Sequence, residues 1–173
     1  MPEMPAFWQM SDREVASGAA YVRTLGSAPS EPVLGDPSRG GRLYVSKGCS
    51  GCHMIAGHGS GYGPELTDVG VKRSLAFLRE SIIAPEASVP EGFLLVELVI
   101  SSGETIRGIR LNEDTFSIQV KDSSNEFHSF RKVDLSELRK LRGKSPMPSY
   151  EHSLAPEELT DLVACLASLR EKS

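Results

Sequence analysis

Residues 47–55 read KGCSGCHMI, and two cysteines and a histidine in this stretch decide what the chain can fold around. Cys49 and Cys52 stand three residues apart, so a single helical turn brings both thiols to one side. His53 follows directly. This Cys-x-x-Cys-His spacing is the pattern by which haem is attached covalently to a chain. Each thiol can add to one vinyl group of the porphyrin, and His53 can then coordinate the iron.

Two other interpretations of the same cysteines stay open. A thioredoxin-like redox pair is expected in a βαβ context, which the flanking Gly48 and Gly51 and the short helical lead-in do not supply. A zinc site needs a fourth ligand, for which Cys165 or His58 could be proposed, although no second Cys-x-x-Cys pair is present. We expect no metal other than haem iron.

The composition is that of a globular chain. Its 173 residues have room for one ordinary domain or two very small ones, and 39% hydrophobic and 24% charged residues fit a folded protein. The net charge of −4 argues against a general nucleic-acid binder. No apolar run reaches the roughly 18 residues needed to span a bilayer, so no transmembrane segment is expected. Three cysteines are too few for a disulfide scaffold.

Four segments resemble class I c-type cytochromes in order and character. Residues 40–53, GGRLYVSKGCSGCH, resemble the N-terminal helix of that family, with Tyr44 on its packing face. Residues 61–70, GYGPELTDVG, resemble the loop below the haem. Residues 144–150, KSPMPSY, resemble the distal loop, and residues 153–169, SLAPEELTDLVACLASL, resemble the C-terminal helix.

The resemblance implies one covalent haem c, attached through Cys49 and Cys52, with His53 and Met147 as the axial ligands of the iron. The carbonyl of Pro64 would accept the Nδ1–H of His53 and orient the ring. Other residues expected around the haem are Pro146, Tyr44, Tyr62, Leu66, Leu75, Leu78 and Ile82.

An iron with two axial ligands has no open position for a substrate, so the resemblance implies an electron carrier and not an enzyme, with no catalytic residues. The expected partners are redox proteins, or an upstream cytochrome or dehydrogenase domain of the same parent chain. The basic stretch at residues 131–142 could steer an acidic partner, or could be an ordinary solvated face. One alternative function is a haem-based sensor or peroxidase-like protein with a displaceable distal ligand, and another is a binding module centred on residues 91–143.

Residues 91–143 contain β-prone runs separated by the turn signals SSG, NED and SSN. They predict a three- or four-stranded antiparallel insertion. The flanking segments predict helices over residues 72–84 and from Pro156 onward, because leucines recur there at helical spacing. We therefore expect a mainly α cytochrome c fold with a β insertion, similar to an expanded haem-binding domain found in some large bacterial proteins.

The beginning of the chain resembles its end. Residues 4–26 start MPAFWQM and align with residues 147–170, which start MPSYEHS. We interpret residues 1–26 as a helical remnant of a preceding cytochrome c domain, with Met4 as a former axial ligand; an ordinary helical extension is the alternative. Residues 27–39 would be the linker, and residues 40–173 the cytochrome c domain. Because haem c attachment requires export, we expect a periplasmic or otherwise exported protein whose signal sequence lies on the parent.

Overall fold

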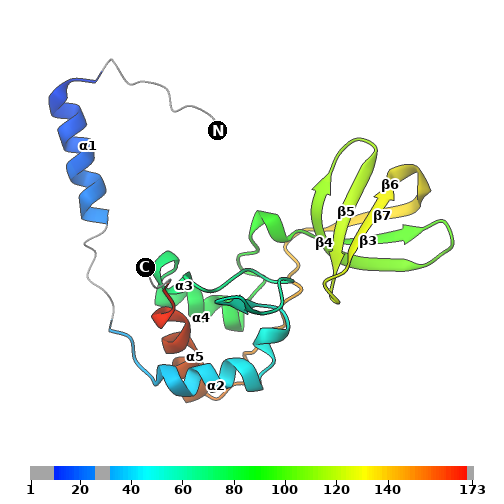
Figure 1. The fold of residues 1–173 in the computed structure, drawn as a ribbon. Coiled ribbons are helices and arrows are strands. Elements are labelled where there is room, and N and C mark those ends of the chain that lie inside the picture. Colours follow the sequence, from blue (N-terminus) through cyan, green and yellow to red (C-terminus); the bar gives the residue numbers. More distant parts are fainter. Residues whose placement is uncertain (1–9, 26–31, 171–173) are drawn as a thin grey trace. The chain divides into compact units, whose positions relative to one another are not determined.

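The computed structural model describes residues 10–25 and 32–170, and the chain divides into two units, Met1–Pro32 and Val33–Ser173 (Figure 1). The first unit contains helix α1 (Asp12–Leu25). Its first turn is closed by a capping box, in which Ser11 N–H donates to the Glu14 carboxylate at 2.7 Å and Glu14 N–H donates back to Ser11 Oγ at 3.4 Å. Met4 lies outside the described residues, so the interpretation of this segment as a domain remnant stays a prediction.

The second unit begins with the helical part of the fold. Its elements are α2 (Pro37–Ser46), the 3-10 turn η1 (Cys49–Gly51), the strands β1 (Met54–Ile55) and β2 (His58–Gly59), α3 (Val69–Lys72), α4 (Leu75–Ile83), η2 (Glu91–Phe93) and, at the end of the chain, α5 (Pro156–Ser168). The helix predicted over residues 72–84 starts three residues late, because Arg73 is extended and Ser74 caps the helix by accepting the N–H of Phe77 at 3.2 Å.

Helices α2 and α5 pack against each other and hold the helical core together. The buried side chains of this core are Tyr44, Leu78, Ile82, Leu159, Leu162, Val163 and Leu166. An ion pair with a buried carboxylate closes one end of the contact: Asp161, 1% exposed, binds the guanidinium of the exposed Arg39 and accepts the N–H of Asp36 at 2.8 Å. The hydrogen bonds from Arg39 hold the pKa of Asp161 below its usual value.

Between α4 and α5 the chain forms a five-stranded antiparallel sheet. Its strands are β3 (Leu95–Ile100), β4 (Thr105–Glu113), β5 (Ser117–Asp122), β6 (Phe127–Arg131) and β7 (Leu135–Leu141), and their order is β6-β5-β4-β3-β7. The short turn η3 (Lys132–Asp134) links the last two. Four side chains are completely buried in the sheet's own core, Val96, Leu98, Ile118 and Val120.

The prediction of a mainly α fold is wrong. Helices account for 37% and strands for 24% of the structure, so both classes contribute substantially. The physical reason is that the β segment forms a sheet with a hydrophobic core of its own, separate from the core of the helices. The helices are also short, since α3 has four residues and α4 has nine.

The fifth strand, β7, is the one that the sequence did not predict. Its residues, LSELRKL, are good helix formers with leucines at spacing three, which is not the alternation of a strand. The spacing fits a strand here because the register shifts: Glu137 pairs with Val99, whereas Leu135 pairs with Ile100. The extra residue between them brings Leu135 and Leu138 to the same core.

The basic stretch at residues 131–142 is largely neutralised within the sheet. Lys132 and Lys140 both pair with Glu113, at 2.9 and 2.7 Å, and lower the pKa of that carboxyl to about 2. Arg131 pairs with Asp134, and Arg139 with Glu97 and Glu137. These pairs favour an ordinary solvated face over a patch that attracts an acidic partner.

In the part of the chain that the structure describes, no helix combines the length and the apolar character needed to cross a membrane.

The contact between α2 and α5 predicts opposite effects for two adjacent glycines. A Cβ on Gly40 would lie 2.0 Å from the carbonyl oxygen of Asp161, so Gly40→Ala must push the helices apart. We expect the free energy of unfolding to fall by roughly 2–3 kcal/mol. A Cβ on Gly41 meets only Cys165 Sγ at 3.8 Å, so Gly41→Ala should be neutral or stabilise by about 0.5–1 kcal/mol. Urea unfolding of both variants checks this, and equal stabilities would contradict it.

Candidate functional site

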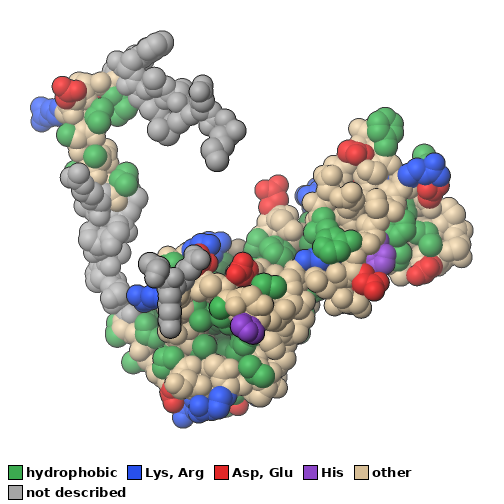
Figure 2. Space-filling view, in the orientation of Figure 1, with side chains coloured by type: hydrophobic (Ala, Val, Ile, Leu, Met, Phe, Trp, Pro, Cys, Tyr) green, Lys and Arg blue, Asp and Glu red, His purple; other side chains and the backbone are tan. Residues whose placement is uncertain are grey.

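A cavity of about 280 Å³ lies in the second unit and gathers most of the residues singled out in the sequence. Its walls are mainly apolar, and Figure 2 shows hydrophobic side chains collected on the visible face of the helical part. Eleven predicted residues line it: Cys49, Cys52, His53, Met147, Pro64, Pro146, Tyr44, Tyr62, Leu66, Leu78 and Ile82. Segments almost a hundred residues apart in sequence therefore converge on a single space.

His53 is held in one orientation from two sides. Its backbone carbonyl accepts the hydroxyl of Tyr44 at 2.9 Å, and its ring Nδ1 lies 2.8 Å from the carbonyl oxygen of Pro64. Because a carbonyl can only accept, Nδ1 carries the proton and Nε2 keeps a free lone pair. Burial lowers the pKa of His53, which favours the neutral, coordinating form of the ring. His53 is thus prepared to act as a metal ligand through Nε2.

Cys49 and Cys52 present free thiols to the same cavity. They are joined by the turn η1, which is closed by the bond from Cys52 N–H to the Cys49 carbonyl at 3.1 Å. Burial raises the pKa of the Cys49 thiol. Catalytic thiols of the thioredoxin type have lowered pKa values, so this environment disfavours the thiol-redox interpretation.

A loop that follows the Cys-x-x-Cys-His segment lies directly against the His53 ring. Gly63 N–H donates to the carbonyl of Cys52 at 2.6 Å, and Leu66 N–H donates to that of Met54 at 2.9 Å. A Cβ on Gly63 would lie 2.8 Å from His53 Cε1, so only glycine allows this approach. The same loop supplies Pro64, the partner of Nδ1.

Met147 reaches the cavity from a loop that is tied to the end of α4. Tyr150 N–H donates to the carbonyl of Ile82 at 3.0 Å, and Ser149 Oγ donates to that of Ile83 at 2.5 Å. Met147 N–H is itself bound by Ser145 Oγ at 3.1 Å. Two prolines flank the methionine and restrict its backbone further.

The sequence interpretation differs from the observed lining in a few places. Leu75 does not line the cavity; it begins α4 and packs against the helical core instead. Of the two arginines in the segment predicted as a helix over residues 72–84, Arg73 lines the cavity, with its guanidinium 4.7 Å from the Phe77 ring centroid, whereas Arg79 donates to Thr160. Residues that the sequence did not single out are Phe77, Val69, Tyr150 and the segment that includes Pro85, Val89, Pro90 and Phe93.

Some of these additional lining residues could have been found from the sequence, and others could not. Phe77 lies in the predicted helix, one residue from Leu78, and Tyr150 stands in the segment already assigned to the distal loop. The Pro85–Phe93 segment has no helical or strand period, so only its place in the fold identifies it.

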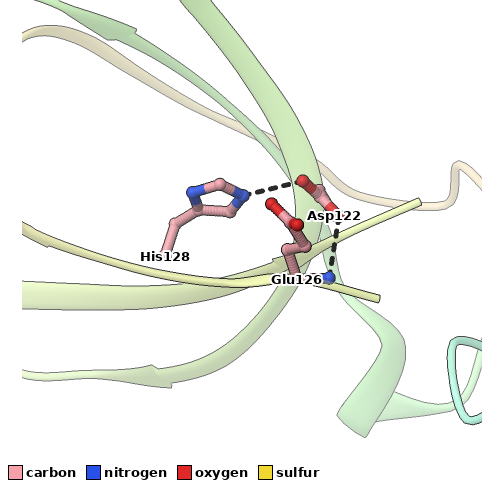
Figure 3. A group of neighbouring side chains, drawn as sticks. All are labelled: Asp122, Glu126 and His128. Carbon is pink, nitrogen blue, oxygen red and sulfur yellow. Dashed lines mark hydrogen bonds and ion pairs between the residues drawn. The ribbon is translucent and has the colours of Figure 1, made fainter. Parts of the chain in front are cut away.

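The remaining histidines lie away from the cavity. His58 is exposed and bonds to the Ala56 carbonyl at 3.0 Å, and the side chain of His152 is 94% exposed. His128 Nε2 lies 2.7 Å from Asp122 Oδ2 on the β5–β6 hairpin, beside Glu126 (Figure 3). None of these three histidines lines the cavity, whereas Met147 does.

The group of Asp122, Glu126 and His128 is explained by the turn that it closes. Asp122 Oδ1 accepts the backbone N–H of Ser124 at 2.9 Å. It also accepts the backbone N–H of Glu126 at 3.0 Å, while Oδ2 is bound to His128 (Figure 3). Both carboxylate oxygens therefore have partners. Among the described residues, Asp122, Glu126 and His128 are the three His, Cys, Asp or Glu side chains that lie close enough together to hold a metal ion. Cys49, Cys52 and His53 do not form such a group. A zinc site at Cys49 and Cys52 is disfavoured accordingly.

The donors of the cavity fit a haem. Two thiols, an imidazole with its Nε2 free and a thioether sulfur line a largely apolar space, which is the donor set of a covalent porphyrin with two axial ligands.

A comparison with known families agrees with the two thiols and the imidazole of this donor set. Residues 37–92 match the family model of Cytochrome c. The match begins with α2, includes the Cys-x-x-Cys-His segment and ends before the sheet, Met147 and α5. It supports a c-type cytochrome that binds haem and has the general function of this family, electron transfer. A search of curated proteins found no match to the chain.

The close contact between Gly63 and the imidazole predicts the effect of a single methyl group. Gly63→Ala should displace the ring from the Pro64 carbonyl and speed the exchange of the Nδ1 proton at least about tenfold. NMR of protein labelled with ¹⁵N in the imidazole measures this rate. Gly51→Ala is the matched control, because a Cβ there meets no heavy atom within 4 Å. Equal protection in both variants would show that the loop does not hold the ring.

Proposed function

We propose that the chain is an electron carrier with one covalent haem c, attached at Cys49 and Cys52 and ligated axially by His53 and Met147. The observation that supports this most directly is the cavity that both thiols, the imidazole and the thioether line together. The match of residues 37–92 to Cytochrome c supports the haem and its general function, while the pairing of His53 with Met147 goes beyond that match.

When bound, haem c supplies a one-electron couple between Fe(II) and Fe(III). The chain's own residues would set the protonation of the His53 ring and the reduction potential of the haem. Pro64 keeps the Nδ1 proton on His53 and so makes Nε2 a better donor. The soft thioether of Met147 would favour the reduced metal and so raise the reduction potential relative to two imidazoles. The apolar walls exclude water and act in the same direction.

Two side chains of the chain itself would occupy the axial positions, so the proposed role is electron transfer and not catalysis on a bound substrate. Little has to rearrange when an electron enters or leaves, because the loops that carry Pro64 and Met147 are both anchored by hydrogen bonds.

We further propose that the chain works as one module of a larger exported redox protein. Cytochrome c domains are typically exported or periplasmic. The resemblance of residues 1–26 to a C-terminal cytochrome helix supports an upstream redox domain as the immediate electron partner, with residues 27–39 as the linker and residues 91–143 as an insertion.

Covalent attachment predicts different results for the three cysteines. After maturation in an exporting host, the pyridine haemochrome spectrum of the wild type should show one haem per chain with two thioether bonds. Cys49→Ala and Cys52→Ala should each shift the band to that of a single thioether, because one vinyl group stays unreacted. Cys165→Ala is the control, since this buried thiol belongs to α5 and does not line the cavity. Wild-type protein without covalent haem would refute the proposal.

Axial ligation by methionine predicts a difference between two methionines. Met147→Leu should abolish the weak long-wavelength band that the cytochrome resemblance leads us to expect for iron–methionine ligation in the oxidised protein, and should open the reduced protein to carbon monoxide. Met54→Leu should change neither property, because Met54 does not line the cavity. A wild type that lacks the band and binds carbon monoxide readily would favour the sensor or peroxidase-like alternative.

A further inference from the structure

The β sheet touches the loop that orients His53, and this contact gives the sheet a role. Lys121, the penultimate residue of β5, extends its ammonium group to the carbonyl oxygen of Gly61, sixty residues earlier in the chain. Gly61 is three residues before Pro64, the partner of His53 Nδ1. Lys121 is partly buried in this position, so its bond is screened less than that of a surface lysine.

Other groups of the sheet surround the same loop. Asn125, at the tip of the β5–β6 hairpin, places Oδ1 4.0 Å from the position of a Cβ on Gly61. Tyr62, only 6% exposed, also lines the cavity. Burial raises the pKa of Tyr62, and smaller electrostatic effects come from Cys52, from Arg107 of β4, which lowers it, and from Asp122 of β5. Two side chains of the β5–β6 hairpin, Lys121 and Asn125, therefore lie against the loop.

The hairpin is itself rigid at this point. Asp122 binds the N–H groups of Ser124 and Glu126, and Asn125 N–H donates to the Asp122 carbonyl at 2.9 Å. Asn125 adopts a left-handed backbone conformation with φ of 67°, which asparagine tolerates in tight turns. The register places Lys121 opposite Phe127 and Ile109, inside the ladder on both sides. The ammonium group thus extends from a fixed backbone.

On the opposite side, the loop is attached to the Cys-x-x-Cys-His segment. Ser60 N–H donates to the Ser50 carbonyl at 3.0 Å, and Gly63 N–H donates to that of Cys52 at 2.6 Å. Between these two bonds lies Gly61, whose carbonyl is the acceptor for Lys121. The loop is therefore held between the haem-attachment turn and the sheet.

We propose that Lys121 is a positioning residue for the haem site: by binding the Gly61 carbonyl it clamps residues 60–64 onto His53, and this clamp is a function of the β sheet. The inference rests on the proposed haem function for its consequence, but the clamp itself is a property of the polypeptide. Loss of the ammonium group should leave the thioether attachment unchanged and let the loop open locally.

The reduction potential would be an ambiguous readout of the clamp. Removing the positive charge of Lys121 should lower the potential, whereas loosening the bond between His53 and Pro64 should raise it, so the two effects oppose each other. Amide hydrogen exchange separates them, because it reports the opening of the loop directly.

The experiment compares Lys121→Met with Lys132→Met in the haem-loaded protein. Lys132, in the turn η3 between β6 and β7, is also a partly buried lysine and donates to a backbone carbonyl, that of Asp114, at 2.6 Å. In Lys121→Met the amide of Gly63 should exchange about tenfold faster than in the wild type. The amide of Lys47, bound to the Leu43 carbonyl at 2.8 Å, should not change. In Lys132→Met neither rate should change, and Lys121→Arg should restore most of the protection of Gly63.

The proposal is overturned if Gly63 exchanges at the wild-type rate in Lys121→Met, or if Gly63 and Lys47 speed up equally, which would indicate a general loss of stability. The visible spectrum of the same samples shows whether haem is bound. A spectrum without haem would count against the proposed function, whereas unchanged exchange at Gly63 in a protein with a normal spectrum would count against the clamp alone.

Discussion

The hydrogen bond between His53 Nδ1 and the Pro64 carbonyl is the constraint on which the site depends. It assigns the proton to Nδ1, leaves the Nε2 lone pair free and requires the loop to lie close against the Nδ1 edge of the ring. This close approach is possible because residue 63 is a glycine. A free imidazole next to two thiols would be compatible with several metals. An imidazole fixed in this way, in a cavity that the thioether of Met147 also lines, suits an iron porphyrin.

The two hydrophobic cores differ in whether their side chains also line the cavity. The helical core shares Tyr44, Leu78, Ile82, Leu162 and Leu166 with the cavity, so packing and cofactor binding use the same side chains. The core of the sheet is filled by its own residues and lines no part of the cavity. The sheet can therefore act as a rigid support, whose influence on the site passes through polar contacts such as the one from Lys121 to Gly61.

The local elements were predictable to different degrees. The helix from Pro156 and the turn that carries the cysteines follow from periodicity and spacing, and both are present. The fifth strand was missed because a bulge converts a helix-like leucine spacing into a one-sided face. The mainly α prediction failed for the related reason that no local pattern reveals whether a β segment can enclose a core of its own.

By itself the sequence determined the chemistry of the donors, because thiols, imidazole and thioether are properties of residue types and their spacing. It also identified part of the cavity lining, including Leu78 and Ile82, since the apolar residues of an amphipathic helix face the interior wherever the helix packs. Only the tertiary structure decided which groups meet. The convergence of Met147 with His53, the lining by the Pro85–Phe93 segment and the contact of Lys121 with Gly61 all join residues far apart in sequence. Such contacts depend on how whole elements pack, and local propensities do not encode that arrangement.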